Sequence, residues 1–215
     1  MPIKYEQMTK NVLTKTQVHI LYLHGFNSSP ESEKAIVTRQ YFAEHFPAVH
    51  FHCPQIASKP IDAILQLEQL INHFSFSDDN PQWYFIGSSL GGYFSTYFSE
   101  KYQRPAVLIN PAIKPYQLLT DYLGEQVNPY TNEVYQVTVD FIEQLKKLEQ
   151  SKLVKNNYLL MVQTGDEVLD YRQAVKFYQN AQIIEQQGGD HSFVGYEKML
   201  PNIVNFFHLT EPNLT

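Results

Sequence analysis

The chain alternates short apolar runs with segments whose apolar residues recur at helical spacing. The six runs are residues 17–26, 48–54, 82–88, 105–111, 157–164 and 181–187. Apolar strands separated by amphipathic helices are typical of a mainly parallel sheet that is covered on both faces and connected by right-handed crossovers. The sequence therefore predicts the α/β class, with any ligand beyond the carboxyl ends of the strands.

Length and charge limit what such a chain can do. The 215 residues, 43% of them hydrophobic, suit one domain with a sizeable core. The formal net charge of -6 disfavours nucleic acid and anionic membranes as partners. The N-terminal residues lack the apolar region of a signal peptide, and no later run is long enough for a membrane span. We expect a cytoplasmic protein whose oligomeric state the sequence leaves open.

Cysteine and histidine usage argues against a structural metal. Cys53 is the single cysteine, which excludes an internal disulfide and a cysteine-based zinc cluster, and we expect it to be a small buried residue. His50 and His52 share one strand face, but no third ligand is evident. We expect neither a metal nor an organic cofactor.

The interval between two of the predicted strands is too long for a simple crossover. About 45 residues separate Pro111 from Tyr158, so we interpret residues 112–156 as a cap inserted into a single domain that spans 1–215. Apolar spacing predicts one amphipathic helix there, through Val137, Phe141, Leu145 and Leu148. Four tyrosines of the interval either line a pocket or pack the cap on the body: Tyr116, Tyr122, Tyr130 and Tyr135.

The stretch "FIGSSLGGYFS" contains a candidate nucleophile. A G-x-S-x-G elbow needs small residues two before and two after its serine, because a strained strand-to-helix turn brings two backbones together there. Ser89 has Gly87 and Gly91 at those positions, whereas Ser88 would have Ile86 and Leu90. An apolar strand precedes Ser89 and a helical apolar stripe follows it, so Ser89 is the predicted nucleophile. A phosphate-binding turn is the alternative, but no accompanying P-loop or dinucleotide motif is present.

A serine nucleophile needs a base, and the base needs an orienting acid. His191 lies just past the last predicted strand, on the same sheet edge as Ser89, and is the predicted base. The acid should precede it in the loop after the preceding strand, where "QTGDEVLDY" offers Asp166 nearest to the strand end. Asp170 stands before a helical segment with Gln173 three residues on, which favours a capping role. Asp190 is too close to His191 in sequence to be its partner.

The developing oxyanion of an acyl transfer needs preorganised donors. The backbone N–H of Leu90 follows the nucleophile at a helix start, and the loop "HGFNSS" offers a second backbone N–H at Phe26. His24, in the same loop, is predicted to be structural rather than catalytic.

Five stretches together resemble the α/β-hydrolase superfamily: "LYLHGFNSSP", "GSSLGGYFS", "LINPA", "QTGDEVLDYRQA" and "GGDHSFVGYE". Over residues 18–207 the chain is similar to the small bacterial esterases typified by YqiA. The resemblance implies an α/β-hydrolase fold and a triad of Ser89, Asp166 and His191. It implies hydrolysis of small-molecule carboxylic esters or acyl thioesters without a cofactor. An acyltransferase with the same triad, or a catalytically silent binding protein on the same fold, is the alternative.

Overall fold

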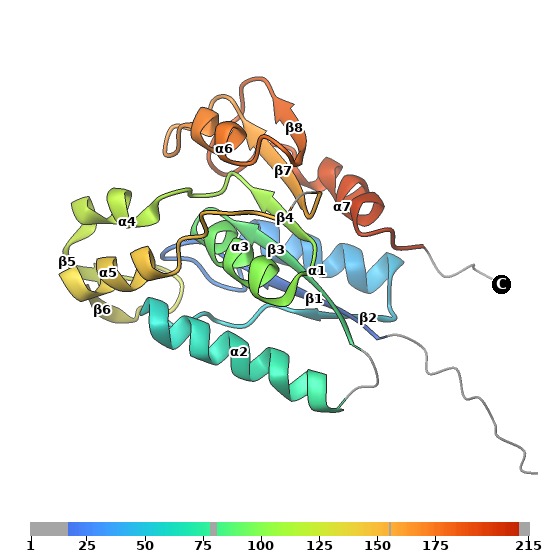
Figure 1. Ribbon diagram of the computed structural model, residues 1–215, viewed down its shortest axis with the longest axis horizontal. Helices are drawn as coiled ribbons and strands as arrows, with labels where there is room; N and C mark the ends of the chain where they lie inside the picture. The colour runs from blue at the N-terminus through green and yellow to red at the C-terminus, as the bar shows by residue number, and fades with distance from the viewer. Residues whose placement is uncertain (1–16, 78–80, 155, 211–215) are drawn as a thin grey trace, which may run out of the picture.

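The computed structural model describes residues 17–77, 81–154 and 156–210, and its centre is a six-stranded sheet (Figure 1). The strand order is β2-β1-β3-β4-β7-β8, and every neighbouring pair is parallel. The strands are β1 (Val18–Leu23), β2 (Val49–His52), β3 (Gln82–Ser88), β4 (Ala106–Ile109), β7 (Tyr158–Gln163) and β8 (Gln182–Gln186). The parallel sheet predicted from the six apolar runs is thereby confirmed.

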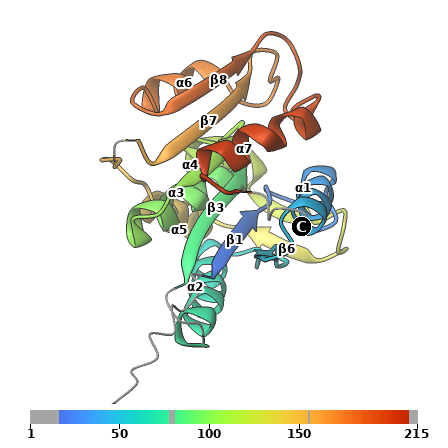
Figure 2. The same ribbon diagram turned by 90° about the vertical axis from the view of Figure 1, so that its right-hand side faces the viewer.

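Helices cover both faces of this sheet. They are α1 (Glu33–His45), α2 (Pro60–Ser77), α3 (Leu90–Tyr102), α6 (Tyr171–Phe177) and α7 (Leu200–Phe206), the last preceded by the 3-10 turn η2 (Tyr196–Met199). Alternate residues of β1 show the two layers: Ile20 and Tyr22 pack with α1 and α7, while Leu21 and Leu23 pack with α2 and α3. Figure 2 shows α1 and α7 on the side of the sheet opposite α3.

The interval between β4 and β7 forms its own small group of elements. They are α4 (Pro115–Leu118), the 3-10 turn η1 (Leu119–Tyr122), the antiparallel strands β5 (Gly124–Val127) and β6 (Val134–Val137), and α5 (Val139–Lys147). The β5–β6 hairpin and α5 lie together at one end of the molecule, at the left of Figure 1.

The helix expected to include Val137 and Leu148 is shorter than its apolar spacing predicted. Val137 is the last residue of β6, and the Thr138 hydroxyl begins α5 by accepting the Phe141 N–H at 3.2 Å. At the other end Leu148 is the C-cap residue. Both residues are still buried, because they pack against the same core as the helix.

Cys53 is half-buried rather than fully buried, and burial raises the pKa of its thiol to about 12. Within the described ranges, no helix is both long and apolar enough to cross a bilayer.

Candidate active site

Ser89 lies between the end of β3 and the start of α3, in a backbone conformation that is rare for a residue with a side chain. Its φ is 55° and its ψ is -120°. Strained conformations of this kind persist only where the surroundings fix them. The turn is held by the Ser89 N–H, which donates to the Ile109 carbonyl at 3.0 Å, and by the Ser89 carbonyl, which accepts from Ala112 at 3.1 Å.

The glycines on either side of Ser89 are required by close backbone contacts. A Cβ at Gly87 would lie 2.2 Å from the Gly91 carbonyl oxygen, and a Cβ at Gly91 would lie 1.9 Å from the Leu23 carbonyl oxygen. Real Cβ atoms do not approach backbone oxygens so closely. The spacing that selected Ser89 over Ser88 therefore corresponds to a real steric requirement of this turn.

The structure brings His191 next to Ser89 from the turn after β8. The His191 Nε2 atom lies 3.1 Å from the Ser89 Oγ atom, although the residues are 102 positions apart. The buried Asn110, at the end of β4, fixes this turn: its Nδ2 donates to the Asp190 and His191 carbonyls at 3.0 and 3.3 Å. The Glu167 carboxylate accepts the His191 backbone N–H at 3.0 Å.

Asp166 contacts the other nitrogen of the same imidazole. Its two carboxylate oxygens lie 3.0 and 2.9 Å from His191 Nδ1, and its side chain is 1% exposed. The N–H groups of Val168 and Leu169 donate to Oδ1 at 2.9 and 2.8 Å, which fixes the orientation of the carboxylate. One continuous series of hydrogen bonds thus joins Ser89, His191 and Asp166. It lies beyond the carboxyl ends of β3, β8 and β7.

The other acidic candidates have different surroundings. Asp170 is the N-cap of α6 and accepts the Arg172 N–H at 3.1 Å, which confirms the predicted capping role. The Asp190 side chain makes no hydrogen bond to His191, and its Oδ1 is buried without a partner in the described part of the chain. Its backbone N–H instead donates to the Gln163 side chain at 3.0 Å.

The loop after β1 lies against Ser89, as the oxyanion prediction requires. A Cβ at Gly25 would be 3.3 Å from the Ser89 Cβ. Leu90 is the first residue of α3, so its N–H has no partner from the preceding turn of helix. His24 supports the loop: its Nδ1 lies 3.1 Å from the Gly25 carbonyl and its Nε2 lies 3.2 Å from the Ile56 N–H. Burial lowers the pKa of His24, and the Gly25 hydrogen bond partly offsets this.

A cavity of about 250 Å³ opens beside Ser89 and His191. Its walls come from β1, the loop after β1, the start of α1 and the β5–β6 turn. The lining residues are Tyr22, His24, Gly25, Phe26, Asn27, Ser28, Ser32, Lys34, Ser88, Ser89, Tyr130 and His191. Neither Lys34 nor Asn110 was predicted as a site residue: Lys34 belongs to no local motif, and the "LINPA" stretch that contains Asn110 does not by itself indicate a contact with the turn of His191.

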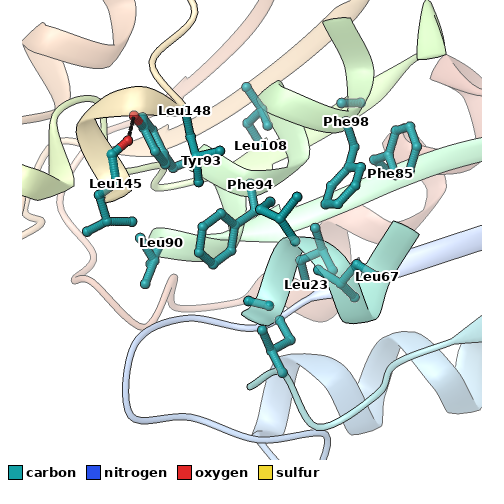
Figure 3. Close-up of a cluster of buried hydrophobic side chains, with 14 of the residues drawn as sticks. Leu23, Leu67, Phe85, Leu90, Tyr93, Phe94, Phe98, Leu108, Leu145 and Leu148 are labelled. Carbon is teal, nitrogen blue, oxygen red and sulfur yellow. Dashed lines mark hydrogen bonds between the residues drawn. The ribbon is translucent and has the colours of Figure 1, made fainter. Parts of the chain in front are cut away.

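The tyrosines of the β4–β7 interval serve both roles that the sequence left open. Tyr130 lines the cavity, whereas Tyr135 donates to Asn27 Oδ1 at 2.6 Å and the Tyr122 ring packs edge-on against Phe26, with centroids 5.6 Å apart. Tyr116 packs against the core cluster. α5 is joined to α3 by a hydrogen bond from the Tyr93 hydroxyl to the Leu145 carbonyl, at 2.8 Å (Figure 3).

The histidines of β2 are part of an aromatic stack. His50 and His52 both stack on His19, and His19 Nδ1 lies 3.0 Å from His52 Nε2. Among the residues that the structure describes, no group of three or more histidine, cysteine or acidic side chains is placed to hold a metal ion.

A parallel sheet of this order, with a strained serine between its third strand and the following helix, defines the α/β-hydrolase fold. The chain belongs to the Uncharacterised protein family (UPF0227), whose model matches residues 19–208.

Solved structures with the same fold come from several organisms. Est1E from Butyrivibrio proteoclasticus is 14% identical with a TM-score of 0.65, over 93% of this chain and 89% of Est1E. The monoacylglycerol lipase of Paleococcus ferrophilus is 12% identical with a TM-score of 0.65, over 88% of this chain and 93% of the lipase. Mouse alpha/beta hydrolase domain-containing protein 10 is 14% identical with a TM-score of 0.64, over 89% of this chain and 91% of the mouse protein. These similarities show the fold.

Proposed function

We propose that the protein is a serine hydrolase that cleaves small carboxylic esters or acyl thioesters. The observation that carries the proposal is the hydrogen-bonded chain from Asp166 through His191 to Ser89, at distances of 2.9 to 3.1 Å. A nucleophile, a base and an orienting acid in this order are the parts that acyl transfer by serine requires. Relatives in fold that are named as a lipase and an esterase domain support the same reaction class.

In the proposed mechanism, Ser89 Oγ attacks the acyl carbonyl carbon while His191 Nε2 accepts the hydroxyl proton. The tetrahedral intermediate collapses, the bond to the leaving oxygen or sulfur breaks, and that atom takes the proton from Nε2. Water then attacks the acyl-enzyme, with its proton passing to Nε2, and Ser89 leaves as the hydroxyl. Asp166 keeps Nδ1 protonated and stabilises the imidazolium in both halves.

The backbone N–H groups of Leu90 and Phe26 are the proposed oxyanion donors. Leu90 directly follows the nucleophile at the positive end of α3, and Phe26 lies in the loop that contacts Ser89 at Gly25. We interpret the segment between β4 and β7 as a cap of the same domain, because its Tyr130 lines the cavity beside Ser89.

A substrate panel tests this function. Purified protein is assayed with acetyl to octanoyl chains, each as the oxygen ester of para-nitrophenol and as an aryl thioester, with the Ser89→Ala variant as control. We expect release of free acid by the wild type and a loss of about a million-fold in turnover in the variant. A folded wild type without activity on any member would contradict the proposal. Acyl transfer to an added alcohol, at the expense of hydrolysis, would instead indicate an acyltransferase.

A further inference from the structure

Lys34 is a half-buried lysine in the wall of the cavity beside Ser89 and His191. Its Nζ donates one hydrogen bond, to the Ser192 carbonyl at 2.9 Å, and in the described part of the chain it forms no ion pair with a carboxylate. An ammonium group has three N–H donors. Two donors of Lys34 therefore stay available to a ligand in the cavity.

The charge of Lys34 is set by its surroundings. Burial lowers the pKa of its ammonium group, while the negative charges of Asp190, Glu33 and Asp166 raise it. Asp166 is already paired with His191. The Lys34 ammonium group thus lies close to several carboxylates, and loss of its charge would make the cavity less favourable for an anion.

The N-terminus of α1 borders the same cavity through Ser32 and Lys34. Ser32 is the N-cap residue of this 13-residue helix, but its side chain makes no capping hydrogen bond. The N–H groups of a first helical turn lack partners within the helix and carry a partial positive charge. The uncapped end can thus donate to an anionic ligand.

Two further residues with hydroxyl groups belong to the cavity wall. Ser88 is 6% exposed and Tyr22 is 1% exposed, and both residues line this cavity. A hydroxyl group can donate a hydrogen bond to an acceptor oxygen. A ligand with several acceptor oxygens suits such a wall.

The position of His191 indicates which part of the substrate enters the cavity. In the proposed mechanism His191 Nε2 protonates the leaving atom, so the leaving group must lie on the side of the imidazole. The cavity is on that side, because His191 forms part of its wall.

We propose that this cavity binds an anionic leaving group, carrying a carboxylate or a phosphate, and that Lys34, Ser32 and the N-terminus of α1 recognise the anion. The inference rests on the proposed function and adds the chemical class of the substrate. Lys34 would then be a specificity-determining residue for an anionic alcohol or thiol.

Three aryl acetates with the same acyl group test the inference. Para-acetoxybenzoate and para-acetoxyphenyl phosphate carry an anion on the leaving phenol, and para-acetoxybenzamide is the neutral analogue. For Lys34→Met we expect kcat/KM on at least one anionic ester to fall about 10- to 100-fold relative to the neutral ester, since a charge-assisted contact is lost. Which anionic ester loses more identifies the carboxylate or the phosphate as the preferred group.

Lys147→Met is the matched control, because Lys147 is exposed on α5 and lies outside the cavity. We expect it to keep the wild-type ratio of anionic to neutral turnover. The inference is wrong if Lys147→Met shows the same selective loss. Long-range electrostatic attraction between the protein's lysines and the anionic esters, and not a contact in the cavity, would then explain that loss. The inference is also wrong if Lys34→Met lowers all three substrates equally, because Lys34 would then act only by positioning His191 through Ser192. A folded wild type inactive on every ester contradicts the proposed function itself.

Discussion

Asp166 and Asp170 are four residues apart in one loop, but the structure gives them different surroundings. The Asp166 carboxylate is buried and contacts His191 Nδ1, whereas the exposed Asp170 caps α6. Both aspartates lie between Ser89 and His191 in the sequence, so sequence order alone allows either of them to be the acid of the triad. The contacts of Asp170 show a capping role, and those of Asp166 support the orienting role that we propose for it.

We expect Asp166→Asn to lower turnover about ten-thousand-fold, because an amide cannot hold the required tautomer of His191 or stabilise its imidazolium. Asp170→Ala should lower the free energy of unfolding by about 1 kcal/mol through loss of the N-cap. Its turnover should stay within about threefold of the wild type. Steady-state kinetics and urea unfolding of both variants provide the check, and activity lost at 170 but kept at 166 would assign the acid to Asp170.

Local sequence context was enough to choose Ser89, His191 and Asp166 as candidates, because each follows a predicted strand at one sheet edge. It was not enough for Lys34 or Asn110. Lys34 acquires its surroundings from Ser192, 158 positions away, and Asn110 reaches the turn of His191 across 81 positions. Contacts of this kind depend on how the strands are ordered, which no short motif contains.

At the scale of single elements, the turn from β3 to α3 depends on the absence of side chains. A Cβ at Gly91 would lie 1.9 Å from the backbone oxygen of Leu23, whereas one at Gly92 would first meet the Pro111 side chain at 2.7 Å. The Pro111 Cβ is fixed by its ring, so both contacts are too close for a real Cβ, but the contact at Gly91 is the closer one. Alanine at each of the two neighbouring glycines therefore compares the cost of a closer clash with that of a less close one.

We expect Gly91→Ala to lower the free energy of unfolding by at least about 2 kcal/mol, since overpacking forces β1 and α3 apart. Gly92→Ala should cost less. Ester turnover should fall with Gly91→Ala even under conditions where the variant stays folded, because Ser89 and the loop after β1 would separate. Thermal unfolding and kinetics measure both effects, and equal stability of the two variants would count against this view of the turn.

The sequence predicted the long elements better than the short ones. α3 spans Leu90–Tyr102 and begins directly after Ser89, where the apolar stripe indicated a helix, because its pattern repeats over several turns. The β5–β6 hairpin was not predicted. Its strands have only four residues each, and exposed residues alternate with less exposed ones, so they lack a continuous apolar run. The same hairpin explains why the expected helix could not include Val137.

At the scale of the whole molecule, His24 links the loop after β1 to the segment that follows β2. Burial lowers its pKa from the usual 6.5, so the folded protein holds this imidazole less protonated than the unfolded chain does. Stability from this group is therefore present above about pH 6.5 and is lost as the pH falls below that value.

We expect the wild type to lose stability on acidification, and His24→Gln to lose part of that pH dependence. His73→Gln, an exposed change on α2, is the control for replacing a histidine by glutamine elsewhere in the chain. Urea unfolding of the three proteins between pH 7.5 and about pH 5 measures the slopes. A His24→Gln slope equal to that of the wild type would show that this imidazole does not couple protonation to folding.

The central claim is that Ser89 is an activated nucleophile, and covalent labelling tests it most directly. The protein is treated with a fluorophosphonate, and the modified residue is located by peptide fragmentation that separates Ser88 from Ser89. The account predicts one added phosphonyl group, on Ser89, and labelling that is abolished in Ser89→Ala and strongly slowed in Asp166→Asn. A folded wild type that stays unlabelled, or that carries the label on Ser88, would contradict it.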